Sequence, residues 1–301
     1  MQKKLHKTMK NGKIAIVSPA GAVEEKYIDG ATTQLALWGF EAIVTPHARG
    51  QYGRYSATAQ ERINDLQWAI NQEDIMAILC ARGGYGAIQI VDKIDFSPLK
   101  KYPKYFIGFS DITVFHNVLT NLKIPSVHGI MAKHLTENAP NEMSVEMLHH
   151  ILLGQKPLHR IPPHELNRNG TAKGILTGGN LSVLYGLRGT KYDIKPRGKI
   201  LFLEDLSEKP YHIDRMMTNL KLGGILENLS ALIIGQFTDF EEDESMLKSI
   251  YDIIFDAVSD YNFPVCFNFP AGHVKNNLPL IFGEKYQFII NEKEVLLIPF
   301  F

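Results

Sequence analysis

The sequence of 301 residues has no excess of charge, since Lys and Arg together number 32 and so do Asp and Glu. Proteins whose main partner is nucleic acid or an anionic membrane usually carry a basic excess, so this composition argues against both partners. The sequence also lacks a run of about 18 apolar residues, as a membrane-spanning helix would need. The basic residues 1–13 contain no apolar segment. We therefore expect no signal peptide, and a cytoplasmic protein.

Cysteine is scarce, and patterns typical of metal ligands are missing. Cys80 and Cys266 each lie in an apolar segment. Two cysteines do not make a disulfide framework, so we expect buried free thiols. Of the 11 histidines, His149 and His150 are adjacent. Adjacent side chains on a helix point about 100° apart, so these two rings cannot both bind one metal ion. No Cys-x-x-Cys motif occurs. We expect neither a metal nor another cofactor.

The residues that are present predict an α/β protein with two domains, because the chain is about twice a typical domain length. In the first part, short apolar segments alternate with helical patterns. This alternation is typical of a parallel sheet with helices on both faces, in a doubly wound domain. The strands expected there are 13–21, 41–46, 75–80 and 104–110, and the helices are 23–38, 59–71, one from 87, and 112–122.

The pattern changes after a helix expected at 143–153. Residues 155–174 contain three prolines and two glycines with little periodicity, which predicts a linker between domain 1–154 and domain 175–301. For the second domain we expect strands at 199–204, 231–237 and 264–268, helices at 211–222 and 244–259, and a hairpin at 286–299.

Two segments of the first domain could carry chemistry. Ser110, in G-F-S-D-I-T (108–113), falls where an apolar strand meets a helix. Such a turn raises a serine Oγ above the carboxyl edge of a sheet, although capping a helix is the commoner use of serine. Arg82–Gly86 (R-G-G-Y-G) follows a strand and opens a helix. Its N–H groups could form half of an oxyanion hole, or the glycines could simply allow a tight turn.

A nucleophilic serine needs a base and a group that orients the base. His273, in P-A-G-H-V-K (270–275), lies in a loop just after a short strand. Glu204 and Asp205 end an apolar strand, and the carboxyl ends of strands are where active sites of α/β sheets collect. Capping a turn or a helix is the alternative role for this acidic pair.

Eight segments of the chain stand out together. In order, they are IAIVSPAG, CARGGYGA, YFIGFSDIT, VHGIMA, GGNLSVLYGLRGT, LFLEDLSEKPYHIDRM, LIIGQF and FPAGHVKNNLPLIFG. In this order and spacing they resemble the LD-carboxypeptidase family of serine peptidases, which includes murein tetrapeptide carboxypeptidases and microcin C immunity peptidases. The resemblance implies a flavodoxin-like N-terminal domain joined to a C-terminal domain built on a small β-sheet, a homodimer, and a Ser-His-Glu triad without metal.

By motif, the resemblance assigns the nucleophile to Ser110, the base to His273 and the orienting acid to Glu204. It assigns the oxyanion hole to the backbone N–H groups of Gly84 and Asp111. The triad would then draw on both domains, with Ser110 in the first and the other two members in the second.

Two further charged residues have open roles. Arg82 could bind the terminal carboxylate of a peptide or brace its own loop by a salt bridge. Glu208 lies four residues past Glu204 and is the alternative orienting acid, although we expect it to shape a loop or touch substrate.

The resemblance implies removal of the terminal D-alanine from a murein tetrapeptide in peptidoglycan recycling. Two alternatives remain open: an immunity peptidase that hydrolyses an acyl-sulfamoyl adenylate, and a non-catalytic small-molecule-binding protein. The residue before D-alanine, diaminopimelate or lysine, is open as well.

Overall fold

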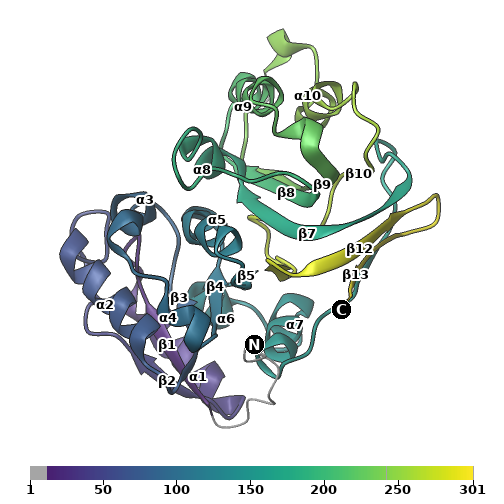
Figure 1. Ribbon diagram of the computed structural model, residues 1–301. Helices are drawn as coiled ribbons and strands as arrows, with labels where there is room; N and C mark the ends of the chain where they lie inside the picture. The colour runs from purple at the N-terminus through teal and green to yellow at the C-terminus, as the bar shows by residue number, and fades with distance from the viewer. Residues whose placement is uncertain (1–11, 242, 301) are drawn as a thin grey trace. The chain divides into compact units, whose positions relative to one another are not determined.

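The computed structural model describes residues 12–241 and 243–300, which form two compact units. The first unit runs to Lys156 and also includes Lys275–Ile281. The second comprises Pro157–Val274 and the chain from Phe282 onward. In Figure 1 the first unit is mostly purple and blue, and the second mostly green and yellow. Residues 1–11, in which we expect no signal peptide, lie outside the described residues.

A six-stranded sheet forms the centre of the first unit, in the order β11-β5-β4-β3-β1-β2. The strands from β5 to β2 pair in parallel. The order β2-β1-β3-β4-β5 is that of flavodoxin-like folds, which confirms the fold expected for this part of the chain. The strands are Lys13–Val17 (β1), Glu41–Val44 (β2), Ile75–Cys80 (β3), Tyr105–Gly108 (β4), Ser126–His128 (β5) and Leu280–Phe282 (β11).

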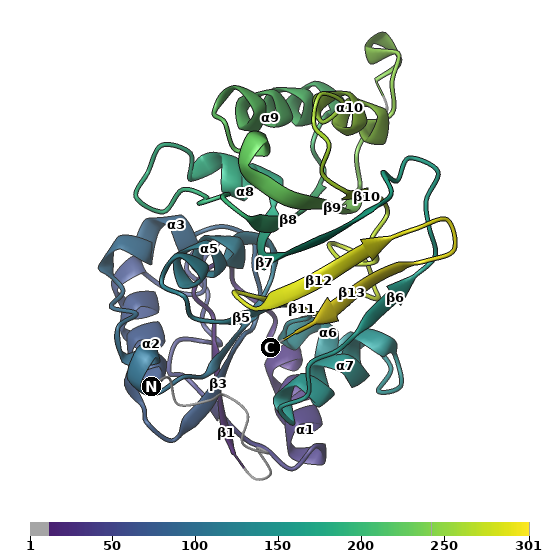
Figure 2. The same ribbon diagram turned by 45° about the vertical axis from the view of Figure 1, so that its right-hand side comes forward.

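Helices cover both faces of this sheet, as Figure 2 shows, and the strands are therefore apolar on both sides. On one face α1 packs against α6, and both share a core with α7. On the other, α2 contacts α3 and α4. The helices are Glu25–Leu37 (α1), Ala59–Asn71 (α2), Ala87–Ile90 (α3), Pro98–Lys101 (α4), Thr113–Asn121 (α5), Ala132–Glu137 (α6) and Met143–Leu152 (α7), with short 3₁₀ turns at Val91–Lys93 (η1) and Ser110–Ile112 (η2).

The second unit contains a seven-stranded mixed sheet in the order β10-β9-β8-β7-β12-β13-β6. The strands from β10 to β7 pair in parallel, and those from β7 to β6 pair in antiparallel fashion. The strands are His159–Ile161 (β6), Gly170–Asn180 (β7), Lys199–Leu206 (β8), Leu229–Thr238 (β9), Val265–Cys266 (β10), Lys285–Ile290 (β12) and Val295–Pro299 (β13).

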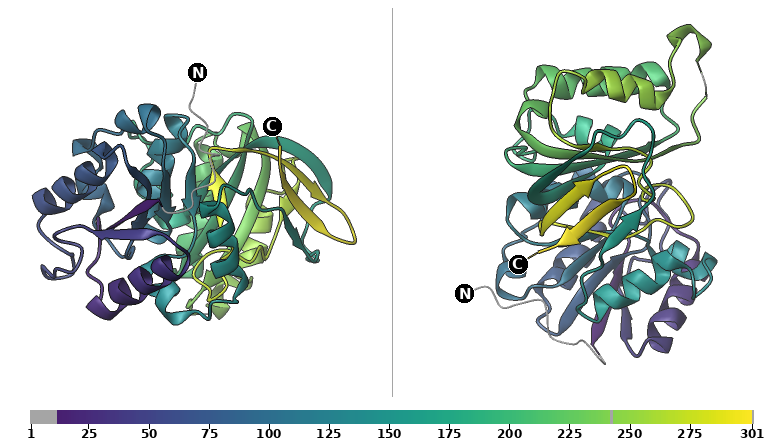
Figure 3. Two further views of the ribbon diagram at one scale, coloured as in Figure 1. Left: turned by 90° about the horizontal axis from the view of Figure 1, so that it is seen from below. Right: turned by 90° about the vertical axis from the view of Figure 1, so that its right-hand side faces the viewer.

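Helices α9 and α10 lie side by side over the parallel part of this sheet, as Figures 1 and 3 show. Their apolar faces and that of α8 share one core with β8 and β9. The helices are Leu181–Gly186 (α8), Pro210–Leu222 (α9) and Ile250–Ala257 (α10), with 3₁₀ turns at Leu226–Asn228 (η3) and Glu244–Met246 (η4). Throughout residues 12–241 and 243–300, every helix is too short or too polar to cross a membrane.

The segment 155–174, expected to be an irregular linker, differs from that expectation. It contains β6 and the first residues of β7, which pair with β13 and β12. The glycines of β7 allow neighbouring backbones to approach closely. A Cβ on Gly174 would lie 2.7 Å from the carbonyl oxygen of Gly198, and one on Gly178 would lie 1.9 Å from that of Phe202.

The helix expected at 244–259 is interrupted. Leu247 has φ +55° after the η4 turn, and α10 begins only at Ile250. Ser249 caps the new helix, because its Oγ accepts from the N–H of Asp252 while the Asp252 carboxylate accepts from the N–H of Ser249. Elsewhere, the expected buried free thiols of Cys80 and Cys266 are observed.

Candidate active site

Ser110 lies at the carboxyl end of β4, where the strand turns into η2 and α5. Phe109 is extended, with φ −154°, but Ser110 has φ +64°. Side chains other than glycine rarely adopt this left-handed conformation, and such residues gather at functional sites. An ordinary N-cap serine has extended backbone angles and accepts a hydrogen bond from the helix. The geometry of Ser110 is instead that of a strained strand-to-helix turn.

The glycine-rich loop Arg82–Gly86 follows β3 and lies against the Ser110 turn. A Cβ on Gly83 would be 2.8 Å from the Cβ of Ser110 and 3.1 Å from its Oγ, which leaves no room for a side chain. Gly84 has φ +93° and Gly86 has φ +138°, both in the region that favours glycine. The loop can therefore pass close to the serine only because these positions lack a side chain.

The side chain of Asp111 joins the Ser110 turn to this loop. Its Oδ2 accepts a hydrogen bond of 2.8 Å from the N–H of Ala87, the first residue of α3. Burial raises the pKa of Asp111 to about 6, although hydrogen bonds from the N–H groups of Ala87 and Gly86 and the charge of Arg62 oppose the rise. The backbone N–H groups of Asp111 and Gly84 are thus carried by two segments fixed to each other, as two donors of an oxyanion hole require.

Arg62 of α2 is a buried cation that the motifs did not point to. It is 2% exposed and donates to the carbonyl oxygens of Pro19 (2.9 Å), Gly86 (3.0 Å) and Ala57 (3.3 Å). Burial lowers its pKa from the usual value. One guanidinium therefore connects the loop after β1, the glycine-rich loop and the segment before α2.

In the second unit, Glu204 and His273 form a buried pair. Glu204 lies in β8 and is fully buried, and His273 lies in the loop after β10 with a side chain 15% exposed. Glu204 Oε2 is 2.7 Å from His273 Nδ1. With Nδ1–H donating to the carboxylate, the basic lone pair of the ring is on Nε2. The preceding Gly272 has φ +129°, and a Cβ there would lie 3.0 Å from the Cβ of Glu204, so glycine permits the close pairing.

The surroundings of His273 favour its protonated form. Burial lowers its pKa, but the hydrogen bond to Glu204 and the charges of Glu204, Asp205 and Asp239 together outweigh burial, and the pKa is raised above its ordinary value. A buried imidazole whose protonated form is stabilised in this way is suited to accept a proton during a reaction.

Asp205, the next residue, faces different partners. Its Oδ2 accepts from the N–H of Ser182 (2.7 Å), and its Oδ1 accepts from the side-chain amide of Asn180 (2.8 Å). Burial and the nearby charge of Glu204 raise its pKa to about 7. Asp205 thus fixes the start of α8, whereas Glu204 holds the histidine.

The two residues with open roles have local partners. Glu208 Oε2 is 3.0 Å from Nδ1 of His212, one turn along in the sequence, so its observed partner is His212 and not His273. Arg82 Nη1 donates a 2.8 Å hydrogen bond to the carbonyl oxygen of Ala22. This contact favours the bracing role of Arg82, through a carbonyl in place of the expected salt bridge.

The sequence-predicted residues fall in both units. Ser110, Gly84 and Asp111 belong to the first, and Glu204 and His273 to the second. In the part of the chain that the structure describes, no group of three or more His, Cys, Asp or Glu side chains is arranged to hold a metal ion.

Comparison with known proteins shows the family to which the chain is similar. The family model of the LD-carboxypeptidase N-terminal domain matches residues 14–129, and that of the C-terminal domain matches residues 173–288. A probable murein peptide carboxypeptidase of Bacillus subtilis (strain 168) is 30% identical over 301 residues, covering 96% of this chain and 92% of the relative.

Solved structures of similar fold point to the same family. The crystal structure of muramoyltetrapeptide carboxypeptidase from Oxalobacter formigenes matches with a TM-score of 0.86 at 27% identity, over 95% of this chain and 97% of that one. The microcin C7 self immunity protein MccF, in complex with aspartyl sulfamoyl adenosine, matches with a TM-score of 0.85 at 19% identity, over 96% of both chains, and shows the same fold. The resemblance seen in the eight segments is thereby confirmed: the chain belongs to the LD-carboxypeptidase family.

Proposed function

We propose that the protein is a serine carboxypeptidase that removes the terminal D-alanine from murein tetrapeptides by hydrolysing the bond between an L-centre and the D-residue. The observation that carries the proposal is the buried Glu204–His273 hydrogen bond, in a chain that also presents Ser110 on a strained turn. A base held by a carboxylate and a serine on such a turn are the parts of a serine hydrolase. The names of the similar proteins supply the substrate class.

In the proposed reaction, His273 Nε2 takes the proton of Ser110 Oγ as that oxygen attacks the scissile carbonyl carbon. Glu204 accepts from Nδ1–H, which fixes the tautomer and stabilises the imidazolium. The N–H groups of Gly84 and Asp111 donate to the oxyanion. The imidazolium protonates the leaving amine of D-alanine as the C–N bond breaks. A water molecule, deprotonated by the same histidine, then hydrolyses the acyl ester and restores Ser110.

The test compares three substrates by mass spectrometry, with Ser110→Ala as the inactive control. A tetrapeptide ending in D-alanine should yield the tripeptide and D-alanine. A pentapeptide ending in D-Ala-D-Ala should react poorly, because one extra residue displaces the scissile carbonyl by about 3.5 Å from the oxyanion donors. Cleavage of the pentapeptide with the tetrapeptide untouched would indicate a DD-peptidase. Turnover of a peptidyl sulfamoyl adenylate alone would indicate an immunity peptidase.

A serine-reactive phosphonate probe separates an enzyme from a binding protein. The wild-type chain should be labelled at Ser110, because His273 activates that hydroxyl, and Ser110→Ala should not be labelled. Absence of labelling together with absence of hydrolysis would favour the non-catalytic alternative.

A homodimer and a role in peptidoglycan recycling, both implied by the family resemblance, complete the proposal, together with a cytoplasmic location. Light scattering coupled to size-exclusion chromatography should give twice the mass of one chain. A monomer at working concentration would contradict the assembly, and recovery of the protein outside the cytoplasm on cell fractionation would contradict the location.

A further inference from the structure

A cavity of about 440 Å³ lies in the first unit beside the glycine-rich loop. Its lining comes from three segments: 21–24 after β1, 51–54 in the loop before α2, and 82–85 in the glycine-rich loop. We call it the Arg54 cavity. Gly84, whose N–H is a proposed oxyanion donor, is one of the lining residues.

Backbone hydrogen bonds hold the three segments together. The N–H of Gly21 donates to the carbonyl oxygen of Gly83 (2.9 Å), and the N–H of Ala22 donates to that of Arg54 (3.1 Å). Gly84 lines the cavity, and a Cβ on the preceding Gly83 would touch Ser110, so the cavity adjoins the loop that packs on the Ser110 turn. A group bound in the Arg54 cavity would therefore lie close to the proposed reacting bond.

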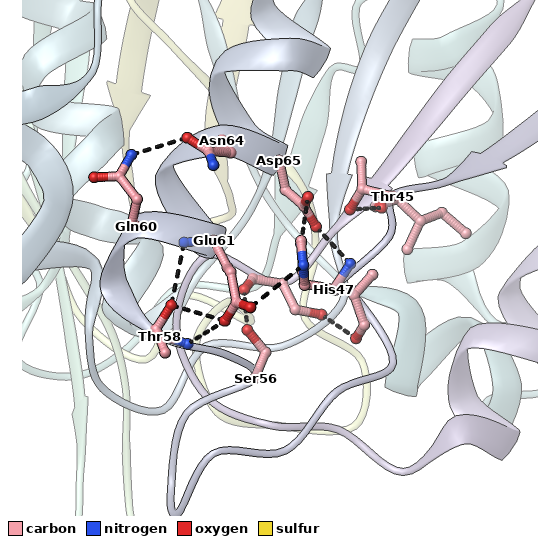
Figure 4. Close-up of polar contacts among 11 residues, drawn as sticks. Thr45, His47, Ser56, Thr58, Gln60, Glu61, Asn64 and Asp65 are labelled. Atoms are coloured by element: carbon pink, nitrogen blue, oxygen red, sulfur yellow. Dashed lines mark hydrogen bonds and ion pairs between the residues drawn. The ribbon is translucent and has the colours of Figure 1, made fainter.

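The loop that carries Arg54 is anchored at both ends by the polar contacts drawn in Figure 4. At the first end, His47 Nδ1 is 2.9 Å from Oδ1 of Asp65 in α2, and the His47 N–H donates to Oδ2. At the other end, Ser56 Oγ donates to the carbonyl oxygen of Ser18 (2.6 Å), and Thr58 caps α2. The turn that bears Arg54 is thus held in place.

The charges that line the cavity favour an anion. Glu24 is 2.7 Å from Lys26, which balances its charge. Arg82 donates to a carbonyl oxygen, which is a neutral partner. The guanidinium of Arg54 lies 5.7 Å from the ring centre of Tyr85 and, within residues 12–241 and 243–300, forms no ion pair.

A neighbouring arginine provides the contrast. Arg49, in the same loop, is bound to Glu25 (3.1 Å) and Asp29 (2.7 Å). Of the two arginines, only Arg49 is paired with carboxylates among the residues that the structure describes. The exposed fork of Arg54 has the geometry that binds a carboxylate through two parallel hydrogen bonds.

We propose that the Arg54 cavity is a carboxylate subsite in which Arg54 binds a free carboxylate of the peptide substrate while Arg82 braces the loop. The inference rests on the proposed function. It assigns the binding of the carboxylate to Arg54, and not to Arg82. Two sources share this chemistry: the terminal carboxylate of D-alanine, and the side-chain carboxylate of a diaminopimelate residue before it. The terminal carboxylate follows the scissile carbonyl within about 3.5 Å, so it lies within reach of a cavity that borders Gly84.

Steady-state kinetics of Arg54→Gln test the proposal, with Arg49→Gln as the matched control. Arg54→Gln should raise KM for the tetrapeptide about 10- to 100-fold, the range expected for loss of a charge-assisted hydrogen bond, with a much smaller change in kcat. Arg49→Gln should leave both constants unchanged. The backbone hydrogen bond from Ala22 to Arg54 does not need the side chain, so the variant should fold, as its circular dichroism and Tm will show.

Two modified substrates distinguish the sources. If the terminal carboxylate is bound, a C-terminal amide should be a poor substrate of the wild type, and Arg54→Gln should not weaken it further. If the side chain is bound, replacing diaminopimelate by lysine should remove the effect of the variant. An unchanged KM in Arg54→Gln on all three peptides would overturn the proposal. If a phosphonate probe without a carboxylate failed to label Ser110 in the wild type, that result would instead overturn the proposed function.

Discussion

Replacing Glu204 by Gln tests how the histidine is held. The substitution keeps the shape of the side chain but removes the charge from a fully buried group that is 2.7 Å from His273 Nδ1. The proposed mechanism needs this charge twice, to fix the proton on Nδ1 and to stabilise the imidazolium. We therefore expect a loss in kcat with little change in KM.

The strength of the Glu204–His273 hydrogen bond sets the size of the loss in kcat. Hydrogen bonds to charged groups contribute about 1.5–3 kcal/mol and neutral ones about 0.5–1.5 kcal/mol, so losing the charge costs about 1–1.5 kcal/mol. This energy is roughly a 10-fold loss in rate. If the amide N–H of the glutamine faces Nδ1, the ring must carry its proton on Nε2, where it cannot take the serine proton, and the loss grows toward about 10³-fold.

The pH dependence of kcat/KM gives a second readout. The hydrogen bond and charge of Glu204 raise the pKa of His273 against the effect of burial, so Glu204→Gln should lower that pKa. Because the base must be neutral, the acid limb of the profile should move to lower pH. Glu208→Gln is the matched control, since Glu208 pairs with His212, and it should leave the limb in place. A mild Glu204→Gln and a damaging Glu208→Gln would refute the assignment of the acid.

Four further outcomes are expected. Ser110→Ala and His273→Ala should each lower kcat by about 10³-fold or more, and the double variant should lose little beyond either, because members of a triad act as a unit; additive losses would separate their roles. Gly83→Ala should lower kcat by about 10²-fold by displacing Ser110, whereas Gly198→Ala, where a Cβ would meet no atom within 4 Å, should only lower Tm. Arg62→Lys should lower kcat more than it raises KM, since one amine cannot replace the fork that holds three loops; an equal effect on both constants would contradict this. Prolonged treatment with a chelator should leave the activity unchanged, and recovery of lost activity by added zinc would refute the serine mechanism.

Elements with a strong local pattern could be predicted from the sequence. The strand 75–80 and the helix 59–71 were expected with the bounds observed, because an apolar run and a 3.6-residue period are local signals. β5 and β11 have three residues each and show no period. β11 also joins a sheet whose other strands end more than a hundred residues earlier, and no local pattern reports such a partner.

In the candidate site, too, the local features could be predicted from the sequence and the contacts between distant residues could not. The turn at Ser110 follows from a short apolar strand and a helix start, but neither its φ of +64° nor the packing of the glycine-rich loop against it is visible in the local pattern. The neighbour of His273 could not be chosen between Glu204 and Glu208 by spacing, and the folded β8 brings Glu204 to it. Arg62 has a signal in the sequence, because this charged residue shares the buried face of α2 with Leu66 and Ile70.

The return of residues 275–281 to the first unit has a consequence for synthesis of the chain. Until those residues leave the ribosome, β5 is the outer strand of an incomplete sheet, and an exposed edge strand invites pairing with other chains. The missing strand follows Lys156 by about 120 residues, a delay of about 6 to 24 seconds at ordinary rates of translation. A fragment that ends at Lys156 would never receive β11. It would be prone to aggregate although it contains five of the six strands.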